Sequence, residues 1–225
     1  MKVLIVILGA GASGKSTLTR ALCGDGGKED VVFYTIEGKA EKAKFTVFPN
    51  GSAIAGNLQS TSDSISYMEA RACLIKDLLK TQDVQFVITD GVRSSKKWDV
   101  DWVQQELTCA VLYVYLDITL EENLKRLVAR REAKGKMVMN PKTYENMLAF
   151  RERAFSVWKA ATDTYRRMPV KFIRLNEGQS TQEWKREVKQ AVGQMFEAEE
   201  QRIKRSEWTK AEVVAGTGVP MVHRS

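Results

Sequence analysis

The sequence predicts an α/β protein, a three-layer α/β/α sandwich around a five-stranded parallel sheet. Five apolar runs without polar alternation are typical of parallel strands that helices cover on both faces. Helix-forming stretches separate most of these runs, and right-handed crossovers then place helices on both sides of the sheet. The predicted strands cover residues 3–8, 31–36, 84–89, 110–116 and 170–175.

The length of 225 residues suits a single domain of this kind. We expect this domain to cover residues 1–205. Residues 206–225 contain two glycines and a proline and show no clear apolar period, which predicts a poorly ordered or peripherally packed C-terminal tail.

Residues 37–57 interrupt the alternation of strands and helices. An apolar stretch at 44–48 is followed by Pro49-Asn50-Gly51, which predicts a β-hairpin with an Asn-Gly turn. We expect this hairpin to project from the sheet as a small insertion.

Several helix starts are marked by their local sequence. Thr119 to Glu122 and Ser180 to Glu183 are capping boxes, and the second predicts a helix that ends near residue 204. Asn140-Pro141 places proline at the first helical position, where it is tolerated. A further helix is predicted over residues 63–80 from its apolar spacing.

Composition limits the function classes. No apolar run approaches the ~20 residues that span a bilayer, and the N-terminal run is too short for a signal peptide, so we expect a cytoplasmic protein without membrane contact. The single histidine, His223, argues against a His-based triad or a multi-His metal site. Cys23, Cys73 and Cys109 are odd in number, far apart and without metal spacing, which indicates reduced, mostly buried thiols.

The charge is basic, with 35 Lys and Arg against 28 Asp and Glu, a net charge of +7. This balance suits a polyanionic partner such as a nucleic acid. It is also common in enzymes that handle nucleotides, so charge by itself does not separate the two.

Residues 9–16 read Gly-Ala-Gly-Ala-Ser-Gly-Lys-Ser between the first apolar run and a helix-forming stretch. This is the G-x-x-x-x-G-K-[ST] pattern of a phosphate-binding loop in the strand–loop–helix context that it requires. Loop amides and the positive end of the following helix would point at a phosphate. Lys15 would reach the β- and γ-phosphates of ATP, and the Ser16 hydroxyl would bind Mg²⁺. The residues expected around the phosphates are Gly9, Ala10, Gly11, Ala12, Ser13, Gly14, Lys15, Ser16 and Thr17.

The same glycines also match G-x-G-x-x-G, the fingerprint of dinucleotide-binding proteins. That fingerprint does not account for the Lys15-Ser16 pair, so we favour the phosphate-binding loop. A glycine-rich turn without a ligand is an equally weak alternative.

An apolar strand at 84–89 ends in Asp90-Gly91. Ligands of open parallel sheets bind at the carboxyl ends of the strands, which places Asp90 near the phosphates. Asp90 could hold Mg²⁺ or accept the proton of an attacking hydroxyl. Its alternative role is that of a turn aspartate. Arg93, three residues further on, could clamp an acceptor or a phosphate.

Residues 111–117 read Val-Leu-Tyr-Val-Tyr-Leu-Asp and precede a helix that carries Arg126, Arg130 and Arg131. Together with the phosphate-binding loop and Asp90-Gly91, this pattern resembles the nucleotide-kinase branch of P-loop proteins. The resemblance implies a lid region over 119–140, whose arginines close over the triphosphate and neutralise charge during transfer. It also implies that Asn176 lies near the adenine. A solvated basic helix face is the alternative for the arginines.

The segment 51–63 is polar and rich in small residues, and Asn57, Ser62 and Asp63 suit an acceptor pocket. Asp63 is equally readable as a helix N-cap. The hairpin and this segment resemble bacteriophage kinases that phosphorylate 5-hydroxymethyluracil in DNA. The resemblance implies an ATP- and Mg²⁺-dependent kinase whose partner is DNA carrying a modified pyrimidine. A deoxynucleoside or deoxynucleoside-monophosphate kinase is the alternative, and a P-loop ATPase without a small acceptor is less favoured. The oligomeric state is not indicated.

Overall fold

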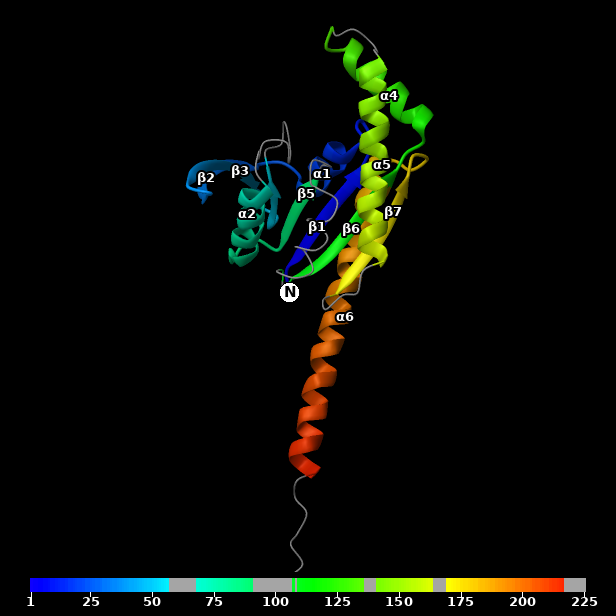
Figure 1. The fold of residues 1–225 in the computed structure, drawn as a ribbon. Helices are drawn as coiled ribbons and strands as arrows, with labels where there is room; N and C mark the ends of the chain where they lie inside the picture. The colour runs from blue at the N-terminus through cyan, green and yellow to red at the C-terminus, as the bar shows by residue number, and fades with distance from the viewer. Residues whose placement is uncertain (57–67, 91–106, 108, 136–140, 164–168, 217–225) are drawn as a thin grey trace, which may run out of the picture.

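The computed structural model describes residues 1–56, 68–90, 107, 109–135, 141–163 and 169–216, with only the backbone described at 68 and 207–216. In this part of the chain, one mixed sheet of seven strands has the order β2-β3-β4-β5-β1-β6-β7 (Figure 1). The strands are β1 (Val3–Gly9), β2 (Lys28–Ile36), β3 (Lys39–Val47), β4 (Ser52–Ala55), β5 (Phe86–Asp90), β6 (Ala110–Asp117) and β7 (Val170–Asn176).

Strands β4, β5, β1, β6 and β7 pair in parallel, whereas β3 pairs antiparallel with both β2 and β4. The predicted parallel strand at 31–36 is therefore wrong in its direction and place. It belongs to β2, an antiparallel edge strand whose residues are exposed or half-buried. An edge strand lacks a neighbour on one side, so an apolar run there does not indicate a central position.

The predicted hairpin at 37–57 forms, but it does not project as a separate insertion. Its two strands, β3 and β4, join the sheet through the predicted turn. Asn50 Oδ1 accepts a hydrogen bond of 3.0 Å from the Ser52 amide, and Gly51 takes a φ of 78° that favours glycine. The short strand β4 completes the parallel part of the sheet in place of the predicted strand at 31–36.

Five helices are described in the same residues, and four of them cover the two faces of the sheet (Figure 1). Helices α2 and α5 pack on one face, and α1 and α6 pack on the other. The helices are α1 (Lys15–Cys23), α2 (Met68–Lys80), α4 (Leu120–Glu132), α5 (Pro141–Asp163) and α6 (Thr181–Gly216).

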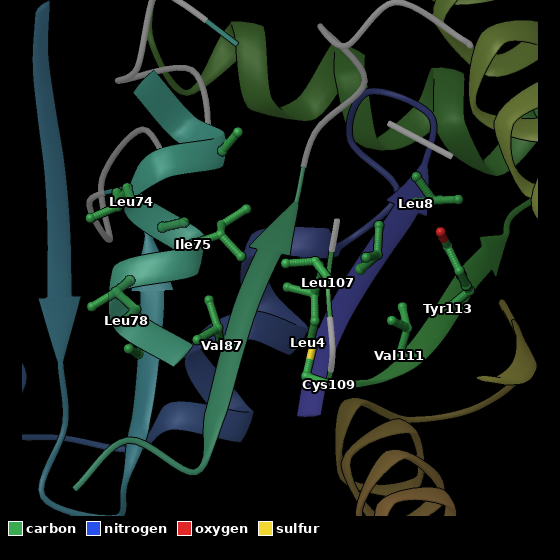
Figure 2. Packing of buried hydrophobic residues seen from close by; sticks show 14 of the residues in the cluster. Leu4, Leu8, Leu74, Ile75, Leu78, Val87, Leu107, Cys109, Val111 and Tyr113 are labelled. Carbon is green, nitrogen blue, oxygen red and sulfur yellow. The ribbon is translucent and has the colours of Figure 1, made fainter. Parts of the chain in front are cut away.

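The core consists of two apolar clusters, one on each face of the sheet. Alternate residues of β1 enter opposite clusters because successive strand side chains point to opposite faces. Leu4 and Leu8 pack with α2 and α5, and Figure 2 shows Leu4 near Val87. Ile5 and Ile7 pack with α1 and α6. This double burial explains why β1 reads as a continuous apolar run.

Both capping boxes mark true helix starts. The Thr119 hydroxyl accepts a bond of 3.3 Å from the Glu122 amide at the start of α4. At α6, Ser180 and Glu183 exchange both bonds of the box, at 3.3 Å and 2.7 Å. At α4, the Thr119 amide donates its hydrogen bond of 2.8 Å to Glu177 and not to Glu122, the usual acceptor in a capping box.

Helix α6 is longer than predicted. It continues to Gly216, through the first half of the expected tail at 206–225, and extends away from the sheet (Figure 1). Its surface is rich in charged residues, and local ion pairs such as Lys204–Glu200 at 2.8 Å support the helix where no sheet lies against it. None of the helices in the described residues has the length and apolar character that crossing a membrane requires.

The three cysteines are free thiols in the structure, and Cys23 and Cys109 are buried. Burial raises the pKa of both thiols to about 11. A protonated, buried thiol is a weak nucleophile, and the burial of two of the three cysteines agrees with the prediction of mostly buried thiols.

Candidate functional site at the carboxyl edge of the parallel strands

The glycine-rich loop connects the central strand β1 to helix α1, as its sequence predicts. Gly14 is the N-cap residue of α1, with φ 101° and ψ 7°, and it provides no side-chain cap. The first amides of α1 thus lack the usual side-chain acceptor. An open helix N-terminus of this kind suits an anion, because the amides and the helix dipole both favour negative charge.

Lys15 folds back over this loop. Its Nζ donates hydrogen bonds to the Gly9 carbonyl at 3.0 Å and the Ala10 carbonyl at 2.6 Å. These bonds hold the ammonium group at the mouth of the loop. Ser16 and Thr17 follow on the first turn of α1, where Ser16 is half-buried and Thr17 is exposed.

The side chain of Trp184, in the first turn of α6, packs against the loop at Gly14. A Cβ atom added at Gly14 would lie 3.0 Å from Cζ3 of Trp184. The Trp184 Nε1 group donates a bond of 2.9 Å to the carbonyl of Asn176, at the end of β7. Trp184 therefore ties the loop to the strand end at which the adenine was expected, although the Asn176 side chain itself is exposed.

We expect Gly14→Ala to lower the free energy of unfolding by about 1–3 kcal/mol, because a non-glycine residue would be strained at this φ and would crowd the buried indole. Gly11→Ala is the matched control, since a Cβ there meets nothing within 4 Å. Urea denaturation of both variants tests the comparison. Equal stability of the two would contradict the described packing.

Asp90 lies at the end of β5, beside β1, where it pairs in register with Ile7. Its side chain is only 3% exposed. Thr19 of α1 contacts Asp90 Oδ2 at 3.5 Å, while Asp90 Oδ1 has no hydrogen-bond partner in the described part of the chain. A buried carboxylate oxygen without a partner is costly, so this atom is a candidate ligand for a cation or for a substrate hydroxyl.

Arg126 is the predicted lid arginine that the structure brings to the loop. Its Nε donates to Glu122 at 2.7 Å, and its Nη1 donates to the Ser13 carbonyl at 3.4 Å. Arg130 is exposed in the last turn of α4, and no hydrogen bond or ion pair described for it reaches the loop. Arg131 occupies the same turn.

Glu177 joins the ends of β6 and β7, a contact that sequence analysis missed. Hydrogen bonds from the hydroxyl and the amide of Thr119 hold the pKa of the Glu177 carboxyl below its usual value. The positive charge of Arg126 lowers this pKa further. The ionised carboxylate thereby fixes the start of α4 and orients the helix that carries Arg126.

Two further arginines at this edge were also missed. Arg151 of α5 donates to the Ile118 carbonyl and, at 3.3 Å, to Asn123 Oδ1. Arg71 of α2 is 6% exposed and donates through Nε to the Thr89 hydroxyl at 3.1 Å, next to Asp90. Each arginine joins a helix to a strand end through contacts that are distant in the sequence, so no local pattern indicates them.

The predicted acceptor residues Asn57, Ser62, Asp63 and Arg93 lie outside the described residues, as do the last five residues of the predicted lid, 136–140. Among the described residues, no group of three or more His, Cys, Asp or Glu side chains is placed to hold a metal ion. A Mg²⁺ ion that binds through nucleotide phosphates needs only one or two protein oxygens. Asp90 and the Ser16 hydroxyl are the candidates near the loop.

Comparisons with known proteins assign no family to this chain. No family model matches the sequence, and no curated protein matches it. The chemical interpretation of the site therefore rests on its own residues: an open helix N-terminus, a lysine at the loop, a buried aspartate and an arginine from α4.

Proposed function

We propose that the chain is an ATP- and Mg²⁺-dependent kinase with a P-loop fold, which transfers the γ-phosphoryl group to a hydroxyl. The preferred acceptor is the 5-hydroxymethyl group of 5-hydroxymethyluracil in DNA. One observation carries the proposal most strongly. A glycine-rich loop between a buried parallel strand and a helix without a side-chain cap lies beside a buried aspartate, whose Oδ1 has no hydrogen-bond partner among the described residues.

The loop residues fit a triphosphate. Gly14 keeps the entrance to α1 free of side-chain atoms, and the helix amides are available for phosphate oxygens. Lys15 would exchange its bonds to the Gly9 and Ala10 carbonyls for phosphate oxygens. Bound ATP with Mg²⁺ supplies the phosphoryl group and partly neutralises its charge.

Asp90 would serve the acceptor side of the transfer. The acceptor oxygen forms a bond to the γ-phosphorus, the bond to ADP breaks, and the hydroxyl proton leaves to Asp90 or to solvent. Burial of Asp90 keeps bulk water from competing with the hydroxyl. Alternatively, the same carboxylate holds the magnesium ion, with Ser16 as its neighbour on α1.

Arg126 would stabilise negative charge on the transferring group. Its Nη1 already lies 3.4 Å from a loop carbonyl, and Glu122 holds its Nε at 2.7 Å. A guanidinium fixed in this way loses little side-chain entropy when it binds phosphate. Arg130, one turn further along α4, would follow if the lid closes over the nucleotide.

The choice of DNA as acceptor rests on the resemblance of the hairpin and the segment 51–63 and on the net charge of +7. A turnover assay tests it, with an oligonucleotide that carries one 5-hydroxymethyluracil compared with the free deoxynucleoside and its monophosphate. Phosphorylation of the oligonucleotide alone is the expected result. Turnover of only a free nucleoside or nucleotide would favour the alternative kinase.

We further expect faster transfer to single-stranded or mismatched DNA than to fully paired DNA. The hydroxymethyl group occupies the position of a thymine methyl in the major groove, whereas transfer requires the hydroxyl within about 3–3.5 Å of the γ-phosphorus. A stacked base cannot reach a loop at the sheet edge, so flipping adds a few kcal/mol for paired DNA.

The measurement compares rates on the three substrates across a salt series. Phosphate contacts should make binding fall steeply as salt rises. Equal rates on all three substrates would exclude flipping, and salt-insensitive binding would argue against DNA as the acceptor.

A further inference from the structure

The β2–β3 ribbon, residues 28–47, extends beyond the rest of the sheet at the edge that holds the candidate site. Strand β3 pairs with β4 only as far as Phe45 and Ala55, whereas β2 and β3 remain paired up to Ile36 and Lys39. Six more residues of β3 thus continue past β4, which corresponds to roughly 20 Å of strand. Since β4 runs parallel to β5, the ribbon passes the edge at which Asp90 lies.

The two faces of this ribbon differ. Val32, Tyr34 and Ile36 pack against the apolar cluster beneath α2. The residues that alternate with them point to the opposite side, where α1 and α6 pack on more central strands (Figure 1). We call this opposite side the outer face and define it by Val31, Phe33, Lys42 and Lys44.

Phe33 is 64% exposed, the largest exposure of any large apolar side chain in the described residues. Val31, two positions away on the same face, is 37% exposed. A strand that presents an aromatic ring and a neighbouring aliphatic side chain to solvent leaves apolar area uncovered, which indicates a binding surface.

Two lysines stand directly across the ribbon from these apolar residues. Lys42 pairs with Phe33, and Lys44 pairs with Val31. Directly paired side chains lie about 4.5–5.5 Å apart at Cβ. The outer face therefore combines an exposed ring with two adjacent cations. Glu29 is the acidic residue on this side, and it pairs with Thr46 near the body of the sheet, away from the ribbon tip.

We propose that the outer face of the β2–β3 ribbon docks single-stranded DNA, with a base stacked on Phe33 and backbone phosphates against Lys42 and Lys44. An aromatic platform flanked by cations is the combination that binds single strands without sequence preference. The charge complements a polyanion, and the ribbon stands beside the edge where the acceptor hydroxyl must arrive. This inference rests on the proposed function. It names the surface that binds nucleotides of the DNA strand other than the one that is phosphorylated.

The test compares Phe33→Ala and the double variant Lys42→Gln/Lys44→Gln with the wild-type chain. Two matched controls remove similar groups elsewhere: Ile203→Ala, from a side chain that is 46% exposed, and Lys80→Gln/Lys204→Gln, from exposed lysines of α2 and α6. Binding is measured by fluorescence anisotropy with a labelled, unmodified single-stranded 20-mer over a salt series. Transfer is measured with the 5-hydroxymethyluracil oligonucleotide and with 5-hydroxymethyl-2′-deoxyuridine.

We expect Phe33→Ala to weaken binding of the 20-mer by about tenfold or more, the scale of one lost base–aromatic stack. The lysine pair should reduce the slope of log affinity against log salt by about 1.4, or 0.7 for each lost phosphate contact. Both variants should raise KM for the oligonucleotide and leave kcat and KM for ATP unchanged. The controls should match the wild type.

Wild-type affinity and salt slope in both ribbon variants would overturn the proposal. A Phe33-dependent self-association without any effect on DNA would also overturn it, in favour of a second copy of the chain that covers the face. If the wild-type chain binds the 20-mer through the ribbon but phosphorylates only the free deoxynucleoside, the docking surface stands and the proposed acceptor is wrong.

Discussion

Lys15→Ala should lower the rate of phosphoryl transfer by at least about 10²–10³-fold, the loss expected when one preorganised donor is removed from a developing charge. The ammonium group is already held at the loop mouth by the carbonyls of Gly9 and Ala10, at 3.0 Å and 2.6 Å. Little reorganisation is therefore needed to place it against a phosphate.

The fold should survive the substitution. Two partly buried hydrogen bonds are lost, each worth about 0.5–1.5 kcal/mol, and the carbonyls that they leave can bind water. Lys15→Met keeps the apolar stem and removes only the charge. Arg20→Ala is the matched control, because it removes an exposed cation from the last turn of the same helix.

Single-turnover assays at saturating ATP and Mg²⁺ measure the effect, and thermal melting checks the fold. Both Lys15 variants should be inactive and folded, and Arg20→Ala should retain the wild-type rate. A near-normal rate of transfer in Lys15→Met would show that the loop does not take part in phosphoryl transfer.

Strands β1, β6 and β7 form within about a residue of their predicted ranges. In β1 and β6, which have neighbours on both sides, burial on both faces leaves a continuous apolar run, whereas β7 is an edge strand whose residues are mostly half-buried. The run at 31–36 did not form a central parallel strand, because its apolar side chains lie in different environments. Val32 packs against the core, whereas Phe33 points to solvent on an edge strand. Composition over six residues cannot separate these cases.

The candidate site also contains residues that the sequence predicted and residues that it did not. The loop, its lysine and Asp90 were predictable because a local motif or a strand end marks each of them. The place of Trp184 was not predictable, because it packs against Gly14, a residue far away in the sequence. One signal was available: the capping box at Ser180 places Trp184 in the first turn of a helix that follows the last strand. Thr19 lies on α1, one turn after Lys15, and no sequence pattern indicated its contact with Asp90.

Asp90→Asn should keep ATP binding and lower the rate of the chemical step by about 10²-fold or more, the usual scale for a general base. The amide has the shape of the carboxyl, so the packing around this 3% exposed side chain is preserved. The contact with Thr19 at 3.5 Å can also persist. What disappears is the negative charge and the ability of Oδ1, which has no partner in the described chain, to take a proton or bind a cation.

The free energy of unfolding of Asp90→Asn shows whether Asp90 has a chemical or a structural role. A buried carboxylate oxygen without a partner costs free energy, so its neutral isostere should leave the free energy of unfolding equal or higher. Asp117→Asn is the matched control: this carboxylate ends β6, on the other side of β1 from β5, but it is paired with Arg174 through Nε at 2.9 Å. That variant should keep the wild-type rate of transfer.

The decisive measurement is single-turnover transfer by Asp90→Asn over a Mg²⁺ titration, together with ATP affinity and urea denaturation. A slow rate at every Mg²⁺ concentration assigns Asp90 to the acceptor hydroxyl, because no amount of metal replaces a missing base. Recovery at high Mg²⁺ assigns it to the metal instead. Reduced ATP affinity with an unchanged chemical rate would show that Asp90 only helps to bind the nucleotide, and a loss of stability would make it a structural residue.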